Sequence, residues 1–179
     1  MLRSLNVCLV VLRLNIISRE GVKADLKKTL AMQQWPVPQN AKALRGFLGL
    51  IGYYRKFFQG YGAIAQPLTN LLKKDGFHWS DTALIAFNKL KAIVAQPPVL
   101  ALPDFSKPFI IECDASGFGF GLGAVLMQDH RPIAYHSQAL KGKHLHLSTY
   151  ETELLAIAIA VKKWRLYLLG RPFIVRTDH

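Results

Sequence analysis

Apolar residues in the first half of the chain recur at the spacing of one helical face. A connection at residues 35–38, interrupted by two prolines, precedes them. Intervals of three and four residues predict an amphipathic helix with Asn40 as its N-cap, and its inward positions are Leu44, Phe47, Leu48, Ile51, Tyr54 and Phe58. Gly46, Gly49 and Gly52 each lower helix propensity by about 1 kcal/mol. We therefore expect another backbone to pack closely against these glycines.

Two more helices are predicted before residue 97. Ser80 is placed to cap a helix over residues 81–95, whose inward positions are Ala83, Ala86, Phe87, Leu90, Ile93 and Val94. Residues 67–74 fit a short helix with Pro67 in its first turn, where a missing N–H costs nothing. Pro97 and Pro98 end the helical half of the chain.

The second half changes to strand patterns. Strands are predicted near residues 108–114, 121–127, 132–137 and 172–178, with a helix at about 148–169 before the last one. The first three strands are close enough in sequence to form hairpins, and the helix crosses back to a strand parallel to one of them. We expect an α+β protein: a small helical module, then a mixed sheet with an α/β-type crossover, and a boundary near residues 97–105.

Charge is concentrated in the helical half. Residues 1–100 hold 14 Lys and Arg against 4 Asp and Glu, whereas residues 101–179 hold 9 against 7, within a total of +12. A basic surface of this size fits a nucleic-acid backbone, although an acidic partner or a solubilising surface is the alternative. An aromatic cluster (Phe47, Tyr53, Tyr54, Phe57 and Phe58) interleaved with cations could stack bases. The candidate nucleic-acid-binding residues are Arg45, Tyr54, Arg55, Lys56, Lys73 and Lys74.

Carboxylates occupy three unusual positions in this basic chain. Asp114 and Asp178 each close an apolar strand, and Glu151 and Glu153 lie at the start of the crossover helix. Because sites form at the carboxyl ends of parallel strands, the two aspartates can converge if their strands are neighbours. One helix carboxylate would then complete an oxygen-rich site for Mg²⁺ or Mn²⁺ suited to phosphodiester hydrolysis.

Helical geometry does not choose between Glu151 and Glu153. The predicted buried stripe runs between them through Leu154, Ile157, Ala158, Val161 and Leu168. Each acid also has an ordinary structural explanation, because glutamates favour the first turn of a helix and aspartates favour turns at strand ends.

Other candidate features carry less chemistry. The glycine-rich stretch after Asp114 lacks a Gly-Lys-Ser/Thr sequence and fits a bulged hairpin better than a phosphate loop. His144 and His146 fit a surface loop. Cys8 and Cys113 form no framework of disulfides, which fits a reduced, intracellular protein in cytoplasm or nucleus. The apolar stretch 7–12 is too short to be a secretion signal or a membrane span, so a buried strand or foreign sequence is expected.

Two groups of motifs resemble gypsy-type LTR-retrotransposon Pol polyproteins. The first is similar to the reverse-transcriptase thumb and connection, and comprises Ile16–Val22 in sequence, the Trp-Pro-Val-Pro turn at 35–38, Leu44 through Phe57, and Pro67 through Lys74. The second is similar to the tethered ribonuclease H module, and comprises Pro98-Val99-Leu100, Pro103-Asp104-Phe105, Asp114-Ala115-Ser116, Pro132-Ile133-Ala134-Tyr135, Glu153-Leu154-Leu155-Ala156 and Thr177-Asp178-His179. Both follow the family order from residue 16 onward.

The resemblance implies an RNase H-like domain that cuts the RNA strand of an RNA–DNA hybrid with two Mg²⁺ or Mn²⁺ ions. It assigns the metal-binding and catalytic acids to Asp114, Glu153 and Asp178, and so selects Glu153 over Glu151. It also implies recognition of the hybrid by backbone and shape, and association with other parts of a Pol polyprotein.

Departures from the family pattern shape the expectation for this chain. The polymerase palm is absent, residues 1–15 match nothing, and the loop after Asp114 is two residues longer than usual. Ending at His179 omits the family's last strand, later helices and fourth metal-site acid. We expect residues 16–97 to form the thumb/connection-like module and residues 98–179 a C-terminally truncated RNase H-like domain. A residual nuclease is one expectation, and a catalytically inactive nucleic-acid-binding remnant is the alternative.

Overall fold

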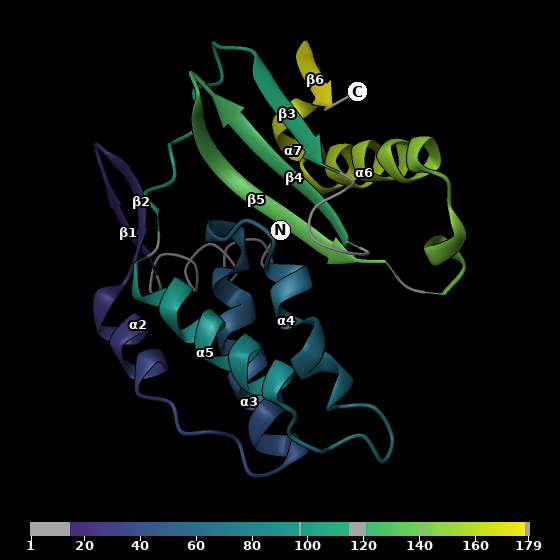
Figure 1. Ribbon diagram of the computed structural model, residues 1–179. Coiled ribbons are helices and arrows are strands. Elements are labelled where there is room, and N and C mark those ends of the chain that lie inside the picture. The colour runs from purple at the N-terminus through teal and green to yellow at the C-terminus, as the bar shows by residue number, and fades with distance from the viewer. Residues whose placement is uncertain (1–14, 97, 115–120, 141, 178–179) are drawn as a thin grey trace, which may run out of the picture.

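The computed structural model describes residues 15–96, 98–114, 121–140 and 142–177 (Figure 1). The predicted segment at 7–12, Pro97, the glycine-rich stretch after Asp114, and Asp178 lie outside these residues. The first half contains the β1–β2 hairpin and a group of helices; its elements are β1 Asn15–Ser18, β2 Gly21–Ala24, α2 Leu26–Gln33, α3 Ala41–Tyr53, η1 Tyr54–Phe57, α4 Tyr61–Asn70 and α5 Asp81–Ala95. The predicted helices at 41 and 81 are confirmed.

Helix α3 begins where the cap predicted it. The Asn40 side chain accepts a hydrogen bond from the Ala43 N–H at 2.9 Å, and Leu44, Phe47 and Ile51 are buried. The expectation for the glycines is wrong. Among the described residues, a Cβ added at Gly46 or Gly49 would meet nothing within 4 Å, and one at Gly52 would meet only the Tyr61 hydroxyl at 3.6 Å. The buried apolar face, rather than close backbone packing, compensates for the poor propensity of these glycines.

Helix α5 also matches its prediction, whereas α4 does not. Ser80 accepts from the Ala83 N–H at 3.3 Å and begins α5 at Asp81. Helix α4 starts at Tyr61, six residues before Pro67, and ends at Asn70, so Pro67 lies inside it. The predicted short helix at 67–74 is therefore wrong. Burial of Ala65 and Leu68 holds α4 together despite the N–H that the proline lacks.

The second half forms a four-stranded mixed sheet. Strands β3 Phe109–Asp114, β4 Gly121–Gln128, β5 Arg131–Ala139 and β6 Phe173–Thr177 lie in the order β5-β4-β3-β6. The pairs β3–β4 and β4–β5 are antiparallel, and β6 joins β3 in parallel after the crossover. The predicted α+β fold and both kinds of pairing are confirmed.

The crossover helix differs from its prediction in length and in its buried face. It is divided into α6 Thr149–Lys163 and α7 Arg165–Leu168 at Trp164. The residues of α6 that are buried are Thr152, Ala156 and Ala160. Of the predicted stripe, Leu168 is buried and Ile157 and Val161 pack against the core, whereas Leu154 is 66% exposed and Ala158 is also exposed. The stripe is therefore confirmed in part, and its centre is shifted toward the small alanines.

Buried apolar side chains form two clusters. Leu100 belongs to the first and Ala101 to the second, so the chain passes from one cluster to the other at this point. The first cluster joins α2 to α5, and we call these helices with η1 the helical unit. The second joins β3, β4, β5, α6 and α7, which with β6 form the sheet unit. Helices α6 and α7 lie on one side of the sheet, and the helical unit lies below β5 (Figure 1), with α4 and η1 in contact with that strand.

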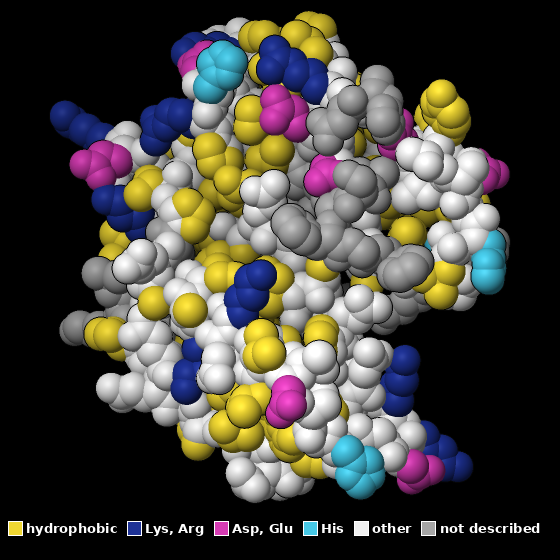
Figure 2. Space-filling view, in the orientation of Figure 1, with side chains coloured by type: hydrophobic (Ala, Val, Ile, Leu, Met, Phe, Trp, Pro, Cys, Tyr) yellow, Lys and Arg dark blue, Asp and Glu magenta, His cyan; other side chains and the backbone are white. Residues whose placement is uncertain are grey.

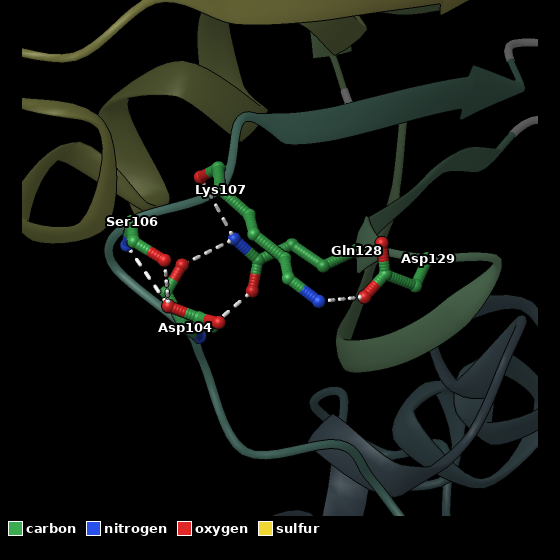
Figure 3. Close-up of polar contacts among 5 residues, drawn as sticks. All are labelled: Asp104, Ser106, Lys107, Gln128 and Asp129. Carbon is green, nitrogen blue, oxygen red and sulfur yellow. Dashed lines mark hydrogen bonds and ion pairs between the residues drawn. The ribbon is translucent and has the colours of Figure 1, made fainter.

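A polar cluster fixes the loop that leads into β3 (Figure 3). The buried Gln128 side chain accepts from the Asp104 N–H at 2.9 Å and donates to the carbonyls of Asp104 and Lys107 at 2.8 and 3.0 Å. The Asp104 carboxylate accepts from the N–H and hydroxyl of Ser106. Gln128 thus ties the end of β4 to the loop before β3 with all of its bonds made to backbone groups.

Candidate functional site

Asp114 is the last residue of β3 and is partly buried. Alternation along the strand places it on the same face as Ile110 and Glu112, opposite the face buried against α6. The Glu112 carboxylate is bound by Arg176 of β6 at 3.3 Å. A counter-charge therefore accompanies Glu112 two residues before Asp114.

The neighbour of β3 is the strand that leads to Asp178. Register in the parallel pair places Cys113 opposite Thr177. These are the residues immediately before Asp114 and Asp178, although Asp178 itself lies outside the described residues. The condition that the two strands be neighbours, on which convergence of the two aspartates depends, is therefore met.

The structure separates the two helix glutamates. Ser148 and Glu151 form a capping box: the Ser148 side chain accepts from the Glu151 N–H at 3.3 Å, and Glu151 Oε2 accepts from the N–H and hydroxyl of Ser148, each at 2.8 Å. These bonds, from the backbone first and then the hydroxyl, lower the pKa of the Glu151 carboxyl. Glu151 therefore completes the helix N-terminus.

Glu153 lies on a different side of α6. It is three residues before Ala156 and seven before Ala160, which places it on the buried face of the helix, and its own side chain is partly buried. Helix α6 contacts β3 and β4 through this face. Of the two glutamates, Glu153 is thus the one on the sheet side of the helix.

Gly123 is a site feature that the sequence did not reveal. It lies opposite Asp114 in the β3–β4 ladder, and an added Cβ would lie 3.5 Å from the Asp114 carbonyl oxygen and 4.0 Å from its Cβ. The missing side chain leaves space beside the Asp114 side chain. Only the pairing register, which the sequence does not specify, could have identified this glycine.

No group of three or more His, Cys, Asp or Glu side chains in the described ranges is arranged to hold a metal ion. His144 and His146 belong to the 3-10 helix η2 Gly142–His146 on the surface, as the loop interpretation predicted. Burial raises the pKa of the Cys113 thiol to about 11, so this cysteine is unreactive at neutral pH.

The residues predicted to contact nucleic acid differ in how exposed their side chains are. Arg45, Arg55, Lys73 and Lys74 are exposed. Tyr54 is 0% exposed, and burial raises its pKa to about 12. Stacking of a base on Tyr54 is therefore excluded in this fold, and that prediction is wrong: the aromatic side chain is needed in the core of the helical unit.

Lys56 is only partly exposed. Its ammonium lies 5.9 Å from the ring centroid of Tyr53 and 5.2 Å from that of Phe57, and burial lowers its pKa. On the face in Figure 2, Lys and Arg side chains are scattered among apolar and other side chains and do not form one continuous patch. Within the described chain, no helix has the length and apolar character that crossing a membrane requires.

The sequence pattern of a known family, described as the RNase H-like domain found in reverse transcriptase, matches residues 79–175. The chain belongs to this family. The match covers the sheet unit and α5, and the resemblance to retrotransposon Pol proteins is confirmed.

Curated relatives of this RNase H-like chain are Pol polyproteins. It is 44% identical over 169 residues to the Pol polyprotein of transposon 297, and 39% over 178 residues to that of transposon gypsy, both from Drosophila melanogaster. Each match covers 92% of the chain but only 16% and 17% of the relative. An uncharacterized mitochondrial protein of Arabidopsis thaliana is 55% identical over 96 residues, which cover 54% of this chain and 61% of that protein.

Solved structures share the fold at low sequence identity. The foamy viral protease-reverse transcriptase dRH in complex with double-stranded DNA has a TM-score of 0.83 at 20% identity, over 93% of this chain and 30% of that one. The foamy viral protease-reverse transcriptase in complex with an RNA/DNA hybrid has a TM-score of 0.82 at 19% identity, over 93% and 24%. The RNase H-like chain thus has the arrangement of helices and sheet found in these enzymes.

Proposed function

We propose that this RNase H-like chain takes part in metal-dependent hydrolysis of the RNA strand of an RNA–DNA hybrid, with Asp114, Glu153 and Asp178 as its acids. The parallel β3–β6 pairing carries the proposal, because its register places Cys113 opposite Thr177, the residues that precede Asp114 and Asp178 in the sequence. We take Glu153 as the third acid because Glu151 completes the helix cap, whereas Glu153 lies on the sheet side of α6. Since α6 covers the face of β3 opposite to Asp114, the two acids are proposed to meet past the carboxyl end of that strand.

Carboxylate side chains suit Mg²⁺ or Mn²⁺, which prefer oxygen ligands. A bound pair of such ions would supply charge stabilisation and an activated water for cleavage of a phosphodiester. The chain's own residues prepare this position: Arg176 neutralises Glu112, so that like charge beside Asp114 is reduced, and Gly123 leaves space next to Asp114.

A hybrid or duplex is the proposed partner. Support comes from the excess of basic residues in the helical half and from the double-stranded DNA and RNA/DNA hybrid bound by the foamy viral enzymes of the same fold. The exposed Arg45, Arg55, Lys73 and Lys74 are proposed to contact the phosphate backbone. We also propose the division into residues 16–97 and 98–179, other parts of a Pol polyprotein as partners, and an intracellular location.

Binding without catalysis is the second candidate function. Strand β6 has a sheet neighbour on only one side in the described chain, and its Phe173, Ile174 and Val175 are 37%, 48% and 36% exposed. Edge strands with exposed side chains open more readily than central strands. A site that depends on the residue after β6 would then be held loosely, while the helical unit could still bind nucleic acid.

Cleavage of a labelled RNA–DNA hybrid with and without Mg²⁺ separates the two functions. For the nuclease, we expect Mg²⁺-dependent cleavage that is lost in Asp114→Asn and Glu153→Gln. Glu151→Gln is the matched control, since it makes the same chemical change at the helix cap and should retain cleavage. Salt-sensitive binding of the hybrid without cleavage in the unmodified chain would instead establish the binding function.

A further inference from the structure

The helical unit meets the sheet along a close contact between α4 and β5. The Gly62 N–H donates to the Ser137 hydroxyl at 2.7 Å. A Cβ at Gly62 would lie 3.1 and 3.2 Å from the backbone nitrogens of Gln138 and Ala139. These neighbours are backbone atoms, which move aside less readily than a flexible side chain, so the close contact favours glycine at this position. The short helix η1, which precedes α4, is also held against β5.

This contact gathers positive charge around one histidine. His136 of β5 is influenced by Arg55 from η1 and by Lys163 from the end of α6; burial first, then Lys163 and Arg55, lower its pKa. Neither cation forms an ion pair with a carboxylate in the described part of the chain. Arg55 belongs to η1, which contacts β5, and Lys163 is the last residue of α6, so cations from both units act on His136 without a described ion-pair partner.

The histidine also has an unused hydrogen-bonding atom. His136 Nε2 is buried and bonds to none of the described residues. Buried polar atoms usually have partners, and one without a partner lowers stability until something bonds to it. The residue as a whole is only partly buried, whereas Nε2 itself is covered, so a ligand can bond to Nε2 only if the imidazole turns toward the surface.

We propose that Arg55, His136 and Lys163 bind a backbone phosphate of the nucleic acid where the helical unit joins the sheet. A phosphate diester supplies the negative charge that the two cations lack and an oxygen that accepts from the His136 Nε2–H. Such a contact fixes the register of the duplex and carries no sequence information. The inference rests on the proposed function because the ligand is nucleic acid, but it does not require hydrolysis.

Binding of a 12-base-pair RNA–DNA hybrid to the full chain, measured without Mg²⁺ over a range of salt concentrations, tests the site. Arg55→Gln/Lys163→Gln is the test variant. Lys42→Gln/Lys89→Gln is the control, because it removes two exposed charges from α3 and α5. We expect the test variant to bind about tenfold more weakly and its dependence of log K on log salt to flatten by about one relative to the control. Circular dichroism verifies that both variants are folded.

The imidazole of His136 gives a second, local measurement by NMR. A bound phosphate favours the charged imidazolium, so we expect the pKa of His136 to rise when the hybrid binds. By linkage, hybrid binding should strengthen as the pH falls through the raised pKa of bound His136, and level off below the pKa of free His136, which lies under the ordinary value of 6.5. In the test variant the pKa of free His136 should already be higher, because Lys163 and Arg55 no longer lower it, and should respond less to the hybrid.

The outcomes distinguish this inference from the proposed function. Equal salt dependence in the test and control variants, or an unchanged His136 pKa on binding, overturns the phosphate site while the function stands. Failure of the unmodified chain to bind the hybrid overturns both. Loss of cleavage in Asp114→Asn with hybrid binding intact supports the nuclease independently of the phosphate site.

Discussion

The helical unit and the sheet unit bury their apolar side chains in different ways. The helical unit packs large aromatic side chains against one another: Phe47 and Phe87 have ring centroids 4.5 Å apart, and both are fully buried. The sheet unit packs a helix through Ala156 and Ala160 and leaves β6 exposed. We therefore expect the helical unit, which holds no acid of the proposed site, to be the more stable of the two.

Truncation of an aromatic core residue should have the largest effect. Phe87→Ala removes a buried ring that contacts Phe47 and Trp79, and we expect it to lower the free energy of unfolding by about 3–5 kcal/mol. Urea unfolding followed by tryptophan fluorescence measures the loss. Phe105→Ala is the control, because that ring is 49% exposed and should cost far less. Equal losses would show that the aromatic cluster is not the main source of stability.

Overpacking of the helix–sheet contact should come next. Ala160→Leu inserts a larger side chain where α6 approaches the sheet, and we expect a cost of about 1–3 kcal/mol. Ala158→Leu makes the same change on the exposed side of the helix and should be nearly neutral. Thermal unfolding of both variants provides the comparison. A neutral Ala160→Leu would mean that α6 is not closely packed on the sheet.

Removal of one helix cap in each unit tests how independently the units unfold. Ser80→Ala and Ser148→Ala each remove a side chain that accepts from a helix N–H, and we expect each to cost about 1 kcal/mol. Trp164 reports on the sheet unit, and Trp35 and Trp79 report on the helical unit. If the units unfold separately, each variant shifts only its own reporter. A common shift in all three would indicate a single cooperative transition.

Disruption of the Glu112–Arg176 pair should have the smallest effect. Both side chains are about half exposed, so Arg176→Gln should cost less than about 1 kcal/mol and less still at high salt. A double-mutant cycle with Glu112→Gln measures the coupling. A much larger coupling would show that this cross-strand pair, rather than backbone pairing alone, holds β6 on β3.

The hydrophobic pattern predicted most elements because their causes are local. Asn40 and Ser80 begin helices within three residues of the groups they bind, and strand alternation placed Asp114 at the end of β3. Failures arose where distant packing decides the outcome. Pro67 is tolerated inside α4 because tertiary burial compensates for its missing N–H.

Part of the candidate site could be predicted from the sequence, namely the two aspartates at the ends of strands joined by a crossover helix. The crossover implied that β6 would lie parallel to one of the first three strands, and the structure shows that this neighbour is β3. Helical geometry left Glu151 and Glu153 open, because the predicted stripe ran between them while the buried residues of α6 are Thr152, Ala156 and Ala160. The family resemblance selected Glu153. His136 and Gly123 gave no signal, since their importance depends on neighbours more than ten residues away or on pairing register.

The hydrogen bonds of Gln128 make the backbone around Asp104 dependent on a segment more than twenty residues later. The Asp104 amide hydrogen is held by a side chain at the end of β4, so it can exchange with solvent only when that hairpin end or the loop opens. Its exchange rate would therefore report on the β4–β5 hairpin from outside it. Hydrogen exchange at the Asp104 amide thus offers a measure of when the end of β4 docks on the loop before β3 during folding.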